Sequence, residues 1–204
     1  MSIPDILIRS ISGYAFVIPG LLLYFGYLKR RGKGQAPLHI AAAFVFCYYL
    51  IRVLTMTGIH TFKPFSPRIV LIPFRDMING PVDTILNVVL FLPLGFFLPL
   101  LYEKYNKINM AALAGLSLSA VVEATQMFGM GATDINDLIT NTVGTCLGYC
   151  IFKSLSKLTK KEFCEKFQTN RINAHIEVLF FELYSFVIMV TIQPFIIGKL
   201  FRLG

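Results

Sequence analysis

Six polar residues of an otherwise apolar region fall in the stretch EATQMFGMGATDINDLITN, residues 123–141. Their carboxylates and amides suit hydrogen bonding to a polar head group, and carboxylates also suit divalent cations. Glu123 follows the uncharged run ALAGLSLSAVV. An ionisable residue at mid-membrane costs about 2.5 to 3.5 kcal/mol on insertion scales. We therefore expect Glu123 to have a functional or site-organising role.

Helical spacing divides the polar residues of this region into two sets. Residues three or four apart share one face of a helix. The connection GMGAT is short enough to force the two helices into an antiparallel pair. If the two faces turn toward one another, two or three carboxylates and two amides converge. The first set is Ser119, Glu123 and Gln126, and the second is Asp134, Asp137 and Asn141.

Each residue of the second set also has a structural interpretation. Asp134 followed by an acid at Asp137 has the form of an N-cap, worth about 0.5 to 2 kcal/mol, and Thr133 offers an alternative cap. Asn141 suits an interhelical hydrogen bond as well as a site. The sequence leaves both interpretations open.

Three residues on other segments are expected at the same depth of the membrane. Asn87 is expected in the first turn of its helix, where it either contributes to the site or bridges helices. Arg52 and Arg75 are the expected ion-pair partners of Glu123, although Arg52 also suits snorkelling to the interface. The candidate ligand-binding set is thus Glu123, Gln126, Asp134, Asp137, Asn141, Asn87, Arg52 and Arg75.

The elements that position these residues are membrane helices. The 204 residues are 55% hydrophobic and only 15% charged, with a mean hydropathy of +0.67. Apolar blocks of about 20 residues predict spanning helices. We expect an all-α polytopic bundle of about six transmembrane helices forming one domain over 1–204, with the first interrupted at Pro19 and Gly20. The spans are expected over residues 6–28, 38–57, 84–101, 110–128, 135–153 and 176–197. Gly144 and Gly148 predict that the polar face of the fifth span is also a tight packing face.

Basic residues set the expected orientation. Twelve lysines and arginines lie in the segments 29–37, 102–109 and 153–175, and six lie in the segments of the opposite side. This bias predicts an outside N-terminus and basic segments that meet lipid head groups, not nucleic acid. The 153–175 segment is either a short surface helix or a linker. The proline-containing connection 58–83 is expected to be an ordered loop that leans on the membrane or folds back over the helices.

The cysteines and histidines do not predict a metal site. The four cysteines lack the spacing of a zinc site or disulfide framework, and no histidine has a partner at helical ligand spacing. We expect no metal and no cofactor.

The sequence resembles the VanZ-like family of membrane proteins. The resemblance rests on IPFRD, ILNVVLFLPLGFFLPLL and VVEATQMFGMGATDINDLITNTVGTCLGY, covering about residues 72–150. Many relatives have an arginine shortly before the first aspartate, which GMGAT lacks. The matching positions are Pro73, Phe74, Asn87, Pro93, Gly95, Glu123, Gln126, Asp134, Asp137, Asn141, Gly144 and Gly148.

The resemblance implies a protein of the bacterial cytoplasmic membrane, associated with lowered sensitivity to lipoglycopeptides such as teicoplanin, without supplying a reaction. The first hypothesis is a polar pocket open to the outer leaflet that meets an amphiphile, either a lipid-linked cell-wall precursor or the lipoglycopeptide. The second is a membrane enzyme acting on a lipid-linked phosphate through a divalent metal. The third is a non-catalytic assembly scaffold that needs only the packing glycines.

Overall fold

The computed structural model describes residues 3–59, 69–70, 80–128, 133–159 and 161–200. In the described part of the chain the elements are helices and one pair of two-residue strands, so the predicted all-α bundle is confirmed. The elements in chain order are α1 (Ile3–Arg30), α2 (Pro37–Met56), β1 (Ile69–Val70), α4 (Pro81–Leu101), η1 (Glu103–Tyr105), α5 (Ile108–Gln126), β2 (Thr133–Asp134), α6 (Ile135–Leu158), α7 (Lys161–Glu165), α8 (Ala174–Val187), the π-helical turn η2 (Ile188–Ile192) and α9 (Gln193–Leu200).

Five helical stretches in the described ranges are long and apolar enough to cross a membrane. They are α1, α2, α4, α5 and the continuous stretch Ala174–Lys199. The segment of the fifth expected span forms the helix α6, whose 24 residues give a length of about 36 Å. It is not among the five, because its first half carries the polar residues that the sequence grouped. Many large apolar side chains of these helices are exposed and suit contact with lipid.

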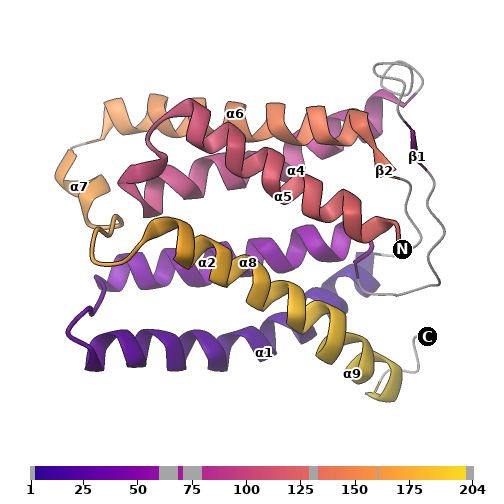
Figure 1. The fold of residues 1–204 in the computed structure, drawn as a ribbon, viewed down its shortest axis with the longest axis horizontal. Helices are drawn as coiled ribbons and strands as arrows, with labels where there is room; N and C mark the ends of the chain where they lie inside the picture. The colour runs from indigo at the N-terminus through magenta and orange to yellow at the C-terminus, as the bar shows by residue number, and fades with distance from the viewer. Residues whose placement is uncertain (1–2, 60–68, 71–79, 129–132, 160, 201–204) are drawn as a thin grey trace.

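The helices lie side by side with α2 in the centre. Figure 1 shows α4, α5 and α6 along one edge, α2 and α8 in the middle, and α1 along the opposite edge. In the most apolar window of α2, 61% of the residues are buried, against 22 to 33% in the other four spans. The central position of α2 explains this difference, since its neighbours cover it and leave their own outer faces to lipid.

Two details of the elements differ from the sequence expectations. The interruption expected at Pro19 and Gly20 is absent, and α1 is continuous through both residues. The Tyr184 hydroxyl donates to the carbonyl of Phe16 at 3.0 Å, one turn before the proline. This bond joins α8 to α1 close to the proline. Helix α4 begins at Pro81, so Asn87 lies in its second turn and not in its first.

The two helices α4 and α6 approach most closely where both carry glycine. A methyl group at Gly148 would overlap the backbone carbonyl of Leu92, and one at Gly95 would overlap that of Thr145. Because the obstructing atoms belong to the backbone, side-chain rearrangement cannot relieve the overlap. The predicted tight packing face of this helix is therefore confirmed, and it fixes the register in which α6 presents its polar residues to α4.

The two ends of the bundle differ in charge. We call the end that contains Glu123, Asp134 and Asp137 the acidic end. The opposite end, which contains the connections 31–36, 102–107 and 159–173, is called the basic end. The short helix α7 lies at the basic end, so part of the 153–175 segment is helical. At the acidic end β1 pairs in parallel with β2, with Ile69 opposite Thr133 and Val70 opposite Asp134. The part of the 58–83 connection at 69–70 therefore folds back against the start of α6.

Candidate functional site

Glu123 joins the last turn of α5 to the start of α6. Its Oε2 accepts a hydrogen bond from the backbone N–H of Asp134 at 2.8 Å, and its carbonyl accepts one from the Thr133 hydroxyl at 2.9 Å. The residue is only 5% exposed. An unpaired backbone N–H at this depth would be costly, so the carboxylate stabilises the turn between the two helices.

Asp134 is the N-cap of α6, as one of the two sequence interpretations predicted. Its Oδ1 accepts from the backbone N–H of Asn136 at 2.8 Å, which satisfies one of the free donors in the first turn. The alternative cap, Thr133, instead donates its hydroxyl to Glu123. The strand pairing with Val70 places the backbone of a third segment beside this cap.

The polar face of α6 contacts two different helices. The Asn87 amide of α4 donates to Oδ1 of Asp137 at 2.5 Å, and the Asn141 amide donates to Oγ of Ser119 on α5 at 2.9 Å. Asn141 is buried, and Asp137 is half-buried. The polar face of α6 therefore meets the α5 face at Ser119, while its Asp137 turns to α4.

Gln126 lies apart from this arrangement. Its amide nitrogen donates to the carbonyl of Thr57 at 3.1 Å, just beyond the end of α2. The helical spacing places Gln126 near the face of Ser119 and Glu123, but the last turn of α5 directs it to the central helix. It thus connects the α4–α5–α6 group to α2 at the acidic end.

The expected ion pair between Glu123 and Arg52 is not formed. Arg52 donates from Nη1 to Oγ of Ser10 at 3.3 Å, which holds it against α1. Arg75, the other expected partner, lies outside the described residues. The carboxylates near enough to Glu123 to repel it are those of Asp134 and Asp137. Within the described ranges the site therefore holds negative groups without a pairing cation within 4 Å of Glu123.

The site also contains vacant hydrogen-bond acceptors. Oδ1 of Asn141 is buried there, and Oε1 of Gln126 is buried nearby at the acidic end; among the described residues neither oxygen has a hydrogen-bond partner. A buried polar atom left without a partner costs about 1 to 3 kcal/mol. Acceptors and carboxylates together suit a ligand that supplies donors, such as hydroxyl, amide or ammonium groups.

A site for a divalent metal finds less support in this geometry. Among the residues that the structure describes, no three His, Cys, Asp or Glu side chains are grouped so that they could hold a metal ion. The carboxylate of Glu123 bonds to the backbone of Asp134, and that of Asp137 bonds to Asn87. Each bond uses one of the two oxygens of its carboxylate.

Sequence reasoning missed three ionisable residues inside the bundle. His39 and Glu177 are 0% and 1% exposed, with 3.7 Å between Nε2 and Oε2, and Nδ1 of His39 lies 2.8 Å from the carbonyl of Phe167. Glu182 lines a cavity of about 200 Å³ between α5 and α8, together with Tyr105 and His175. The sequence did carry a signal for these sites, since Glu177 and Glu182 both interrupt an apolar span. Their partners were not visible because they belong to distant segments.

The comparisons with known proteins agree with the sequence resemblance. Residues 38–157, more than half of the chain, match the family model described as VanZ/LLP1. Protein VanZ of Enterococcus faecium is 39% identical over 80 residues, which cover 39% of this chain and 45% of that protein. The aligned region therefore spans less than half the length of that relative. No solved structure matches the chain.

Proposed function

Because this chain belongs to the VanZ/LLP1 family and forms a multi-pass helical bundle, we propose that it lowers the susceptibility of a bacterial cell to teicoplanin. The proposed place of action is the outer face of the cytoplasmic membrane, with the acidic end outward. Family membership supports the association with teicoplanin resistance. The asymmetric distribution of lysine and arginine supports the orientation.

The proposed mode of action is contact with an amphiphile in the outer leaflet. The single observation that carries it is that the acidic end gathers hydrogen-bond acceptors. This end gathers the carboxylates of Glu123, Asp134 and Asp137 and two buried amide oxygens without partners. A lipid-linked cell-wall precursor and a lipoglycopeptide both combine hydroxyl and amide groups with a long chain. The groups of the acidic end would bind the polar part, while the apolar helix faces accommodate the chain.

Susceptibility testing in a sensitive host examines this proposal. Cells expressing the wild-type chain are expected to tolerate a higher teicoplanin concentration than cells with an empty vector. Asp137→Asn, which removes a charge but keeps an acceptor for Asn87, is expected to reduce that tolerance. The matched control is Glu162→Gln at an exposed carboxyl of α7, far from the acidic end, and it is expected to behave as wild type. Equal susceptibility of cells with the wild-type protein and cells with the empty vector would contradict the proposal.

A scaffold role is the second candidate, and one observation favours it. The Glu123 carboxylate is already bonded to its own chain, as a purely structural group would be. If the protein acts only through assembly, Asp137→Asn is expected to leave tolerance intact while a bulky residue at Gly148 abolishes it. Teicoplanin tolerance of these two variants, at matched membrane abundance, separates the two functions.

A further inference from the structure

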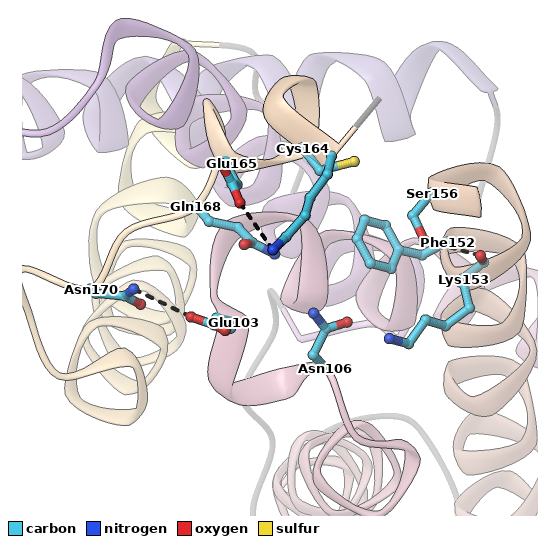
Figure 2. Close-up of a pocket in the computed structure, with 10 residues that line it drawn as sticks. Glu103, Asn106, Phe152, Lys153, Ser156, Cys164, Glu165, Gln168 and Asn170 are labelled. Carbon is cyan, nitrogen blue, oxygen red and sulfur yellow. Dashed lines mark hydrogen bonds and ion pairs between the residues drawn. The ribbon is translucent and has the colours of Figure 1, made fainter. Parts of the chain in front are cut away.

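A cavity of about 440 Å³ lies at the basic end, away from the proposed amphiphile site. It is formed by η1, the last turns of α6, the short helix α7 and the segment that follows α7 (Figure 2). Its volume is in the range of small-molecule sites, which is roughly 300 to 1,000 Å³. The polar groups around it decide which ligand fits.

Two of the four charged residues that line the cavity form an ion pair, and a third accepts a hydrogen bond from a neutral amide. The amino group of Lys161 lies 3.6 Å from Oε1 of Glu165, and the Asn170 amide donates to Glu103 at 3.3 Å. Lys153 differs, because within the described ranges it has no carboxylate within 4 Å. Its ammonium lies 5.8 Å from the centre of the Tyr149 ring, a contact that leaves it able to bind an anion. Within the described ranges the cavity lining therefore holds one cation, Lys153, and one carboxylate, Glu103, that have no ion-pair partner.

Asn106 supplies a vacant acceptor beside this cation. Its backbone is fixed, since its N–H donates to the Glu103 carbonyl at 2.9 Å and its carbonyl accepts from the Tyr149 hydroxyl at 3.0 Å. Its side-chain Oδ1 is buried and has no hydrogen-bond partner. Figure 2 shows the ends of Lys153 and Asn106 facing the same space, with the ring of Phe152 along one side.

These groups together define the chemistry of a ligand. An anion would bind Lys153, a hydroxyl would donate to Oδ1 of Asn106, and a short carbon backbone would lie along Phe152. Glu165 is paired with Lys161, whereas Glu103 accepts a hydrogen bond from the neutral Asn170 amide and keeps its charge. The segments 29–37, 102–109 and 153–175 contain twelve lysines and arginines, and a basic surface of this kind attracts anionic lipid at the membrane surface. We propose that this cavity binds a phosphoglycerol group, as found in the head group of phosphatidylglycerol.

Lipid binding by the purified full-length protein tests the proposal. The protein is placed in nanodiscs of phosphatidylcholine with increasing phosphatidylglycerol, and bound lipid is counted by native mass spectrometry. Lys153→Gln is expected to lower the apparent phosphatidylglycerol affinity about tenfold, as loss of one charge-assisted hydrogen bond does. Lys157→Gln is the matched control. It makes the same charge change one turn later on α6, at an exposed residue outside the cavity, and is expected to change the affinity less than about twofold.

Two further arms identify what is recognised. Lys153→Arg is expected to retain most of the binding, which separates loss of the cation from loss of the fold. Soluble glycerol 1-phosphate is expected to compete with the lipid better than inorganic phosphate, and Asn106→Leu is expected to remove that preference. Equal losses in Lys153→Gln and Lys157→Gln would overturn the proposal, because they would show surface attraction only. No preference of the wild type for phosphatidylglycerol over phosphatidylcholine would overturn it as well. Neither result bears on teicoplanin tolerance.

Discussion

The Glu123 carboxylate near the end of α5 accepts the backbone N–H of Asp134, the N-cap of α6, at 2.8 Å. Glu123 thereby contributes to the shape of the site as well as to its charge. The same N-cap residue starts α6 and pairs with β1, so one hydrogen bond connects three segments of the chain.

The Glu123 bond predicts different effects for two substitutions. Glu123→Gln retains a side-chain oxygen that can accept from Asp134, and its unfolding free energy is expected to stay within about 1 kcal/mol of wild type. Glu123→Ala leaves a buried N–H without an acceptor and is expected to cost about 1 to 3 kcal/mol. Thermal unfolding of both variants in the same detergent measures the difference. Equal destabilisation by the two changes would contradict the structural role of the bond.

The glycine contact between α4 and α6 predicts that a single methyl group is damaging. Gly148→Ala would place that group against the Leu92 carbonyl, and such overpacking is expected to cost about 1 to 3 kcal/mol. The control is Gly26→Ala in α1, where a methyl group meets nothing within 4 Å. That change is expected to be neutral or to stabilise by about 0.5 to 1 kcal/mol, because alanine favours the helix. Comparable unfolding temperatures for the two variants would argue against close packing of α4 and α6.

The bond between Asn87 and Asp137 predicts energetic coupling between α4 and α6. In a double-mutant cycle of Asn87→Ala and Asp137→Ala, we expect a coupling free energy of about 0.6 kcal/mol, up to about 1.7, as for other hydrogen bonds between membrane helices. Pairing Asn87→Ala with Thr125→Ala serves as the control, since the Thr125 hydroxyl bonds within its own helix. Additive effects in the first cycle would show that the observed bond does not join the helices energetically.

The buried pair of His39 and Glu177 predicts a strongly non-additive response. Glu177→Leu alone leaves His39 buried without its carboxylate partner and is expected to cost about 3 to 5 kcal/mol. The double variant with His39→Leu is expected to recover much of that loss. As a control, Glu165→Leu removes one member of an exposed pair and is expected to cost less than about 1 kcal/mol. A double variant that is less stable than Glu177→Leu would contradict the prediction.

The sequence was sufficient for features that depend on local spacing. The helices follow from apolar runs, and the close contact of Gly148 follows from helical periodicity; the place of Asp134 before α6 made it one of two candidate N-caps. Contacts between distant segments depend on how each helix is rotated about its axis, and composition does not specify this. Arg52 therefore bonds to Ser10 instead of Glu123, and the Gln126 amide bonds to Thr57.

The pairing of β1 with β2 has a consequence for the order of assembly. Ile69 and Thr133 are adjacent in space although both α4 and α5 lie between them in the chain. The pairing therefore joins residues that are distant in the chain, and long-range contacts of this kind form slowly. We expect the acidic end to close late in the folding of this region. During refolding, protection of the Asp134 amide from hydrogen exchange would report when its bond to Glu123 forms.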